Sequence, residues 1–559
     1  MSLKIAIVTD THVRPPDDDG QLAFPSDASH NARNKVIVEQ VALRKPDLVM
    51  HLGDVVHPIP TLPTHAPALA EAKAMFEGFG ADLVVVPGNH DVGDKRSSVY
   101  APEQVDAGRK AFAETWGPPF HAFDRDGVRF VVLDGGLLAA NTEEALAQRT
   151  WLLDVLREGR RTFVFTHYPP FLTDPDEPEH YDNLDPSSRR WLLDLCAEHG
   201  VEAVLTGHVH RFFYNRYRGV DIYTVPSTAF VRPAYAWLRP HPAVDAENGR
   251  DDTEHTGFSW LEIDEEGHRL QVIRPRTVGA SSSPQAPKPL GVWLQHRLGR
   301  RAELPMGSLD ALTRKVARDD AMLLHIQALG LGRIRIPLAD GEDRDVLDRV
   351  AWLERHGVEV TVFSGRAPSV ADRALRRQAF ASAEWEVVLR DATLARLREL
   401  TPSDRPWAVE HITLSRIGKP PADGGYFSHF PKQGFELEDP MWRAFAEDPA
   451  VTRVAFRIPS TGNVEGRIAT CIRAAAKAGV GATCHVELPE AAEATRHTDD
   501  EATAAVAAAA SRAAKANPGS HILLDGLYDY DRGYWCKNGL IDLTDQPRKA
   551  AGAIDLATP

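Results

Sequence analysis

Five short clusters of residues in the first 210 positions combine carboxylate, imidazole and amide side chains with glycine. They are Asp10-Thr11-His12, Gly53-Asp54, Gly88-Asn89-His90-Asp91, Thr166-His167 and Gly207-His208-Val209-His210. Oxygen and nitrogen donors of these types suit Mn, Fe, Zn or Co. None of the four cysteines falls in or beside the clusters, which excludes a thiolate site. The residue types are therefore those of a site for two metal ions.

The spacing within the clusters supports this interpretation. Asp10 and His12, like His208 and His210, are separated by one residue. In an extended segment such residues point to the same side, so each pair could grip one ion or two adjacent ions. Glycines precede the ligand candidates in three clusters and permit tight turns where the chain approaches the ions.

The order of the five clusters is similar to that of the calcineurin-like metallophosphoesterase family, in particular its cyclic-nucleotide and glycerophosphodiester phosphodiesterase branch. The resemblance covers residues 1–275. It implies one ion on Asp10, His12 and His210, a second on Asn89, His167 and His208, and Asp54 as the bridge. It also implies that His90 contacts the phosphoryl oxygen or protonates the leaving alkoxide. Asp91 would orient His90 or a metal-bound histidine.

Two such ions imply a reaction class. They lower the pKa of a bridging water, so that hydroxide attacks phosphorus, and they neutralise the phosphoryl oxygens. The sequence thus predicts a metal-dependent phosphoric ester hydrolase, and most of all a phosphodiesterase acting on a small-molecule phosphoester. Monoesters stay open, as does the identity of the metals.

Residues near the clusters allow two interpretations each. His51 lies in an apolar run and is expected to be a hydrogen-bonded core histidine, whereas His57 is expected to line the pocket. The loop 13–34 ends with three residues that could reach a substrate phosphate or sugar, or could belong to a solvated loop: His30, Arg33 and Asn34. Arg211-Phe212-Phe213 could contact a substrate substituent or pack in the core.

The clusters need strands to position them. Each follows a short apolar run, and helical patterns separate the runs; polar groups gather at strand ends in such layered folds. The strands expected are 3–9, 48–52, 83–87, 129–133, 162–166, 203–206 and 222–225, with a final hairpin at 259–263 and 269–273. The prediction is a four-layer α/β/β/α metallophosphoesterase sandwich over residues 1–276, followed by a Ser- and Pro-rich linker over 277–290.

Residues 291–559 show a second rhythm, typical of a (β/α)8 TIM-like barrel. Its eight expected strands are 292–296, 333–337, 358–363, 385–389, 408–414, 454–458, 482–488 and 521–525. Residues 523–550 resemble the end of barrel-type glycoside hydrolases, and Glu487 stands where that family's nucleophile would be. The fourth strand, however, lacks the family's Asn-Glu pair and ends Leu389-Arg390-Asp391.

The barrel is therefore expected to serve substrate recognition or structural support. The alternative is a glycan-binding protein or a bifunctional glycoside and phosphoester hydrolase, in which the barrel recognises a sugar moiety. Candidate positions at the C-terminal strand ends are His296, Asp391, Glu410, Glu487, Asp525 and Asp529.

Composition narrows the partners and the compartment. The chain of 559 residues carries a net charge of −15, which argues against a nucleic-acid polymer as partner. It has no apolar run long enough to cross a membrane. The N-terminus enters a strand directly without a signal-peptide pattern, and four cysteines form no disulfide framework. A cytoplasmic location is expected.

Overall fold

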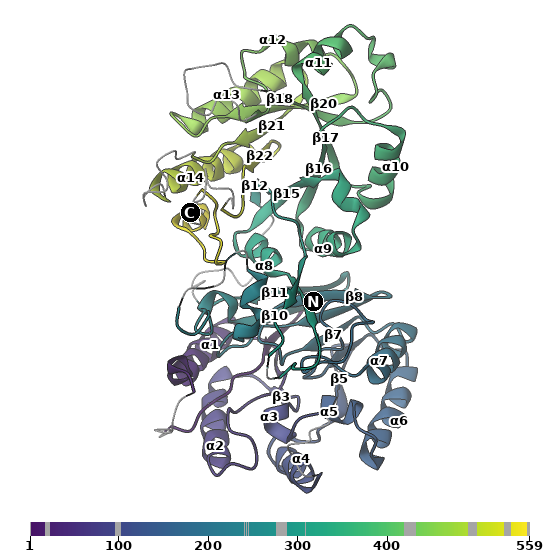
Figure 1. The fold of residues 1–559 in the computed structure, drawn as a ribbon, viewed down its shortest axis with the longest axis vertical. Helices are drawn as coiled ribbons and strands as arrows, with labels where there is room; N and C mark the ends of the chain where they lie inside the picture. The colour runs from purple at the N-terminus through teal and green to yellow at the C-terminus, as the bar shows by residue number, and fades with distance from the viewer. Residues whose placement is uncertain are drawn as a thin grey trace. The chain divides into compact units, whose positions relative to one another are not determined.

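A computed structural model of the chain describes residues 2–16, 23–95, 102–239, 241, 243, 245–275, 288–307, 309–418, 432–489, 500–529 and 538–555. The chain divides into two compact units (Figure 1). The first consists of Met1–Ser282 and Arg300–Leu324, and the second of Ser283–Gly299 and His325–Pro559. No helix in the described ranges has the length and apolar character that crossing a membrane requires.

Two sheets form the centre of the first unit. One has the order β11-β10-β1-β2-β3, built from β1 (Leu3–Val8), β2 (Leu48–His51), β3 (Leu83–Val85), β10 (Phe258–Asp264) and β11 (Gly267–Ile273). The other has the order β4-β5-β6-β7-β9-β8, built from β4 (His121–Arg125), β5 (Val128–Val132), β6 (Thr162–Phe165), β7 (Ala203–Thr206), β8 (Phe213–Tyr217) and β9 (Val220–Thr224). All the predicted strands are present, and β4 and β8 are additional.

Helices cover the outer face of each sheet. Apolar side chains of α1 (His30–Arg44) and α2 (His65–Phe76) share one buried cluster with residues of β1 and β2. Those of α6 (Glu143–Arg157) and α7 (Pro186–Glu198) share another with β5, β6 and β7. Figure 1 shows these two helix pairs on opposite flanks of the unit. The predicted four-layer α/β/β/α sandwich is confirmed. The short helices α3 (Asn89–Val92) and α5 (Gly135–Leu138) and the longer helix α4 (Pro102–Trp116) also connect its strands.

The second unit contains a closed barrel of eight parallel strands, which confirms the predicted TIM-like architecture. Around the barrel run β12 (Lys288–Trp293), β15 (Leu331–Pro337), β16 (Glu359–Ser364), β17 (Glu384–Arg390), β18 (Ile412–Gly418), β20 (Val451–Ile458), β21 (Gly481–Val486) and β22 (His521–Leu524). Pairing of β17 with β18 closes the ring, and the short β19 (Lys432–Gln433) adds antiparallel to β18. The helices of this unit are α9 (Arg344–Arg355), α10 (Val370–Ala379), α11 (Asp391–Arg398), α12 (Pro440–Ala446), α13 (Val464–Lys477), α14 (Asp500–Ala516) and α15 (Lys549–Asp555). The division between the units falls within α8 (Ala321–Ala328).

The barrel residues singled out from the sequence fall into different places. Glu487 and Asp525 directly follow β21 and β22, at the C-terminal ends as expected. Glu410 precedes β18, which starts at Ile412 rather than at residue 408, so Glu410 lies at the opposite end of that strand. Asp391 is exposed and pairs with Arg416.

The division of the chain differs from the predicted boundaries in one segment. The sequence prediction placed Arg300–Leu324 in the barrel, but the contacts assign it to the first unit. There it forms an antiparallel hairpin of β13 (Arg300–Leu304) and β14 (Lys315–Asp319). Of the predicted linker, residues 277–287 lie outside the described part of the chain, and 288–290 already belong to β12.

Candidate metal centre

The five clusters all begin where a parallel strand ends. β1, β2 and β3 are mutually parallel in one sheet, and β6 and β7 are parallel in the other. The carboxyl ends of these strands therefore lie at one edge of each sheet, and the turns that follow them carry the candidate residues. Hydrogen bonds from Asp10 N to Gly53 O (2.9 Å) and from Gly207 N to His167 O (3.0 Å) join neighbouring turns. The sheet topology therefore brings all five clusters together.

The backbone at the candidate ligands is unusual. Positive φ angles occur at five of the seven, with values between 41° and 69°: Asp10, His12, Asp54, His208 and His210. This region is costly for residues with a Cβ, and such conformations concentrate at functional sites. The expectation of extended segments at residues 10–12 and 208–210 was wrong, because left-handed turns direct these side chains inward.

Glycine at position 207 is required by a close approach. A Cβ there would collide with Thr9 Oγ1 and lie 2.7 Å from Asp10 Oδ2. At position 53, where φ is +99°, a Cβ would lie 2.7 Å from Gly88 N and 2.8 Å from His167 Nδ1. The turns pack directly on one another at the site, which confirms the expected use of glycine.

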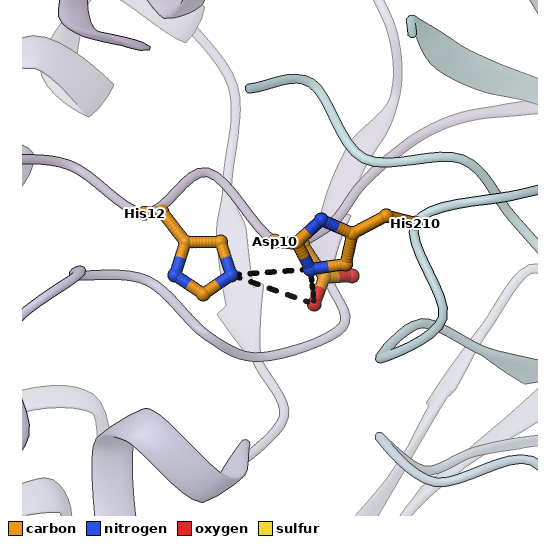
Figure 2. A group of neighbouring side chains, drawn as sticks. All are labelled: Asp10, His12 and His210. Carbon is orange, nitrogen blue, oxygen red and sulfur yellow. Dashed lines mark hydrogen bonds and ion pairs between the residues drawn. The ribbon is translucent and has the colours of Figure 1, made fainter. Parts of the chain in front are cut away.

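Asp10, His12 and His210 form the first group of candidate ligands (Figure 2). His210 Nε2 lies 3.1 Å from Asp10 Oδ1 and 3.2 Å from His12 Nε2. The other oxygen of Asp10 accepts hydrogen bonds from Thr9 Oγ1 (2.7 Å) and from the backbone N–H of His208 (3.0 Å). Asp10 Oδ1 is buried and has no hydrogen-bond donor among the described residues, so it is available to a cation.

Asn89, His167 and His208 form the second group. Asn89 Oδ1 lies 3.1 Å from His167 Nε2 and 3.0 Å from His208 Nδ1, and the two ring nitrogens are 3.3 Å apart. Asp54 stands between the groups. Its Oδ2 is 3.7 Å from His12 Nε2, and its Oδ1 is 3.4 Å from His167 Nε2. One carboxylate thus presents one oxygen to each group.

Backbone carbonyls fix the orientation of three of the rings. His167 Nδ1 donates to Leu52 O (2.8 Å), and His210 Nδ1 donates to Phe230 O (3.1 Å). His208 Nε2 donates to Tyr181 O (3.3 Å). Since a carbonyl can only accept, the opposite nitrogen of each neutral ring carries a lone pair toward the centre. Such a second hydrogen bond is the usual device that orients a metal-bound histidine.

This arrangement fits a pair of cations and poorly fits a purely structural cluster. In their neutral forms His167 and His208 point lone pairs at each other over 3.3 Å, and His210 Nε2 points one at the carboxylate oxygen Asp10 Oδ1 over 3.1 Å. Without a shared proton or cation these pairs would repel each other in a buried site. The donor set of carboxylate, amide and imidazole matches divalent transition metals.

The pKa shifts of the buried groups also indicate that the site requires positive charge. Burial disfavours the charged form of His167, but the neighbouring carboxylates of Asp54 and Asp10 outweigh it and raise its pKa to about 9. Burial alone would raise the pKa of Asp54, but the surrounding imidazoles outweigh it and hold that pKa below its usual value. Burial places the pKa of His12 and of His208 well below the usual value. In the absence of metal, a proton on His167 supplies part of the positive charge that the carboxylates require.

His90 and Asp91 occupy different places around the seven ligand candidates. His90 Nδ1 donates to His57 O (2.6 Å), and its ring stands edge-on to His12 at 4.7 Å between centroids. A nitrogen of His90 also lies within 4.8 Å of ligand atoms of His12 and Asp54. The ring of His90 therefore borders the centre, and the residue is half-buried, so it is partly exposed to solvent.

The Asp91 carboxylate contacts backbone rather than the His90 ring. It accepts hydrogen bonds from the N–H groups of Asp54 (2.8 Å), Val55 (3.1 Å) and Gly88 (2.9 Å). Burial and the adjacent Asp54 charge raise its pKa to about 7. Asp91 thus ties the turn that carries Asp54 to the turn that carries Asn89 and His90.

The other histidines near the clusters are hydrogen-bonded or ring-packed. His51 Nδ1 accepts from Gly53 N (3.2 Å) and its Nε2 lies 3.0 Å from Thr11 Oγ1, which in turn donates to Val55 O. Burial lowers the pKa of His51 to about 3, so it is a neutral core residue, as its apolar run indicated. The ring of His57 lies 5.5 Å from that of His12.

The flanking residues support the site from behind. Asn34 Nδ2 donates to Thr11 O (2.6 Å), Arg33 Nη1 donates to Ala229 O (2.6 Å), and His30 Nδ1 lies 3.3 Å from His12 O. Phe212 and Phe213 are buried, in accord with core packing rather than substrate contact. Residues 17–22 of the loop 13–34 lie outside the described part of the chain.

One group of supporting residues has no signal in the sequence pattern. Tyr181 provides the carbonyl that orients His208, and Asp182 Oδ1 lies 3.8 Å from His208 Nε2. Both belong to a segment without regular structure, and they reach His208 only through the tertiary fold.

Comparisons with known proteins agree with this geometry. Residues 3–212 match the family model described as calcineurin-like phosphoesterase. The serine/threonine-protein phosphatase CPPED1 of Bos taurus is 35% identical over 188 residues, which are 32% of this chain and 58% of that protein. A probable cyclic nucleotide phosphodiesterase of Rhodococcus erythropolis is 25% identical over 256 residues, 44% of this chain and 76% of that protein.

The aligned region spans 58% of the length of the phosphatase relatives. Among solved structures, a dimetal phosphatase from Danio rerio is similar with a TM-score of 0.33 and 14% identity, over 49% of this chain and 96% of that one. The match to the family model coincides with the strands and turns that assemble the metal centre. Residues 3–212 of this chain therefore form a domain that matches the calcineurin-like phosphoesterase family model.

Proposed function

We propose that the protein is a dinuclear metal-dependent phosphoester hydrolase whose preferred substrate is a small phosphodiester. The single observation that carries the proposal is the position of Asp54, which presents one oxygen to each of two groups of facing donors. The ions would be held by Asp10, His12, Asp54, Asn89, His167, His208 and His210. Bound there, two divalent ions supply an activated water and offset the charge of the phosphoryl oxygens.

The chain's own residues then have distinct tasks. Carbonyls of Leu52, Tyr181 and Phe230 keep the ligand nitrogens directed inward. Asp91 holds the two turns in register. His90 donates its Nδ1–H to His57 O and presents Nε2 beside the centre. In its imidazolium form the ring also carries a proton at Nε2, which it gives to the leaving oxygen. We call Asp91 a positioning residue and His90 the catalytic acid.

The test is hydrolysis of bis-p-nitrophenyl phosphate and p-nitrophenyl phosphate by the full chain loaded with Mn, Fe, Zn or Co. The proposal expects hydrolysis with at least one metal, and faster turnover of the diester. Failure to hydrolyse either ester, with two ions bound under all four conditions, would refute the enzyme assignment. Faster turnover of the monoester would refute the substrate preference alone.

Replacement of His90 by glutamine is expected to reduce kcat by about 100-fold for an ester with an alkyl leaving group. The effect on a p-nitrophenyl ester should be much smaller, because p-nitrophenolate leaves without a proton. Steady-state kinetics on both esters measures the contrast. His121→Gln is the matched control, since His121 bonds only to Pro118 O at the start of β4 among the described contacts. Equal losses on both esters would exclude a proton-donor role.

The barrel offers a second candidate function. Barrel lumens are commonly filled by branched apolar residues, but here a charged network occupies the lumen. Arg335 donates from Nε (2.6 Å) and Nη2 (3.1 Å) to Glu386, and His485 Nε2 lies 3.0 Å from the same carboxylate. β21 and β17 are not neighbouring strands, so His485 and Glu386 meet inside the barrel. Such buried pairs seldom increase stability over apolar packing.

Donors and acceptors of both charges also surround the C-terminal strand ends. Glu487 binds Arg457 through both oxygens, and Asp525 follows the last strand. Burial and the charge of Glu487 raise the pKa of Asp525 to about 6. This balanced polar end suits a neutral ligand with several hydroxyl groups, such as a sugar, so we propose sugar binding as the barrel's function.

Calorimetric titration of the full chain with glucose, galactose, mannose and N-acetylglucosamine tests this second candidate. Binding of at least one sugar is expected, and Asp525→Asn should abolish it. Asp391→Asn, an exposed change on the same barrel, should retain it. No heat of binding with any of these sugars would count against a sugar site.

A further inference from the structure

The hairpin Arg300–Leu324 lies against the loop that carries two candidate ligands. Val209 stands between His208 and His210, and it shares one buried apolar cluster with Leu304 of β13 and Ala317 of β14. Phe213, Tyr235 and Leu238 complete the contact. The chain thus inserts this hairpin between the first two barrel strands in sequence and packs it within the phosphoesterase unit. A segment outside residues 3–212 therefore covers the back of the metal centre.

A buried charge network links the same hairpin to His208. Lys315 Nζ contacts Asp182 and donates to Asp310 Oδ2 (2.7 Å). Asp182 also accepts from Tyr235 OH (2.7 Å) and pairs with Arg232. Both Asp182 and Lys315 are buried, with 0% and 4% of their side chains exposed.

The network continues to the metal ligand along two short paths. Asp310 Oδ1 accepts from the backbone N–H of Tyr181 (2.9 Å), and Tyr181 O accepts from His208 Nε2 (3.3 Å). In parallel, Asp182 Oδ1 lies 3.8 Å from the same nitrogen of His208. Lys315 contacts both aspartates, so its ammonium group links the carboxylate of Asp182, which Arg232 also holds, to the carbonyl of Tyr181 on the outer side of the His208 ring.

We infer that Lys315 is a positioning residue for the second metal ion, acting through Asp182, Asp310 and Tyr181 on the ring of His208. The inference rests on the proposed metal centre. Its physical basis is that a ligand's affinity depends on the groups that orient its ring, and the loss of such a group typically weakens metal binding 10- to 100-fold. Asp10, His12 and His210 have no described contact with Lys315, so the first ion should be affected less.

The test is a comparison of metal affinity in the full chain and the Lys315→Met variant. Chelator competition followed by elemental analysis gives the number of ions retained, and the electron paramagnetic resonance of Mn²⁺ separates coupled pairs from isolated ions. We expect Lys315→Met to bind one ion about 10- to 100-fold more weakly. Its spectrum should change from that of a coupled pair to that of isolated Mn²⁺.

Two further variants separate positioning from folding. Lys315→Arg retains a cation and is expected to restore pair binding at least in part. Arg314→Met alters an exposed neighbour on the same hairpin, which pairs with Glu303, and should bind both ions as the wild type does. If Lys315→Met fails to fold, Asp310→Asn gives the decisive measurement, because it weakens the link to Tyr181 and leaves Arg232 paired with Asp182.

The outcomes distinguish the two proposals. A wild-type protein that binds no ion pair overturns the proposed function and this inference together. A wild-type protein that binds two ions, with Lys315→Met or its substitute Asp310→Asn equal to it in affinity and spectrum, overturns only the role of Lys315.

Discussion

Replacement of Asp54 by asparagine is expected to lower kcat for phosphoester hydrolysis by on the order of 1,000-fold or more. The carboxylate faces both groups of donors, so its loss removes negative charge from both ion positions at once. Charge stabilisation by a metal is worth several kcal/mol, and each 1.4 kcal/mol corresponds to a factor of ten in rate. Asparagine retains the size of the side chain and one oxygen, so the fold should persist.

The measurement combines steady-state kinetics with metal analysis. Asp54→Asn should retain fewer than two ions after dialysis and should turn over bis-p-nitrophenyl phosphate at a rate near background. Asp82→Asn is the matched control, because Asp82 is an exposed aspartate of the same unit that pairs with Arg125. A variant that retains both ions and half of the wild-type rate would show that Asp54 is not the bridging ligand.

The candidate ligands could be picked out from the sequence because their types and order are local features of the chain. Each cluster follows an apolar run, and parallel strands must bring their ends together. Predicting the two sheets was therefore enough to predict that the seven ligand candidates lie close together. Both sheets were predicted apart from β4 and β8. Those strands carry polar residues such as Asp124, Asn215 and Arg216, which obscure the alternation expected for a half-buried strand.

Backbone conformation was not predictable from the same pattern. Asp10 and His12 adopt positive φ without glycine, held by bonds such as His12 N to Asp54 O (3.1 Å). An extended segment was the default expectation for an i, i+2 pair, and only tertiary contacts favour the left-handed turns. The contacts of Asp91 were hidden for the same reason, since two of its three backbone partners are N–H groups of a turn 36 or 37 residues away.

The segment of residues 300–324, which contains the β13–β14 hairpin, is a second feature that only tertiary contacts determine. Its strands contain Arg300, Arg301, Glu303 and Lys315, and this charged composition does not predict strands that pack against a buried core. Lys315 is instead buried against Asp182, 133 positions earlier in the chain. A buried lysine becomes apparent only when its partner is placed, because charged residues are seldom buried unless paired. Domain boundaries from composition cannot detect such an insertion.

Removal of the metal ions is expected to abolish activity and to lower the unfolding temperature of the phosphoesterase unit. Without cations, the facing nitrogens of His12 and His210 stand 3.2 Å apart in a buried site. An ion present at 100 times its dissociation constant stabilises the folded state by about 2.7 kcal/mol. For a unit of this size that corresponds to roughly 4 °C per ion.

Differential scanning calorimetry before and after chelation checks the shift, and the barrel serves as an internal reference. The seven candidate ligands all belong to the first unit, so a transition of the second unit should remain unchanged. Adding back Mn or Zn should restore both the rate and the unfolding temperature. Full activity in a chelated sample in which elemental analysis finds no metal would contradict the proposed mechanism. In that case protons on the imidazoles, and not metal ions, would balance the charge of the buried carboxylates.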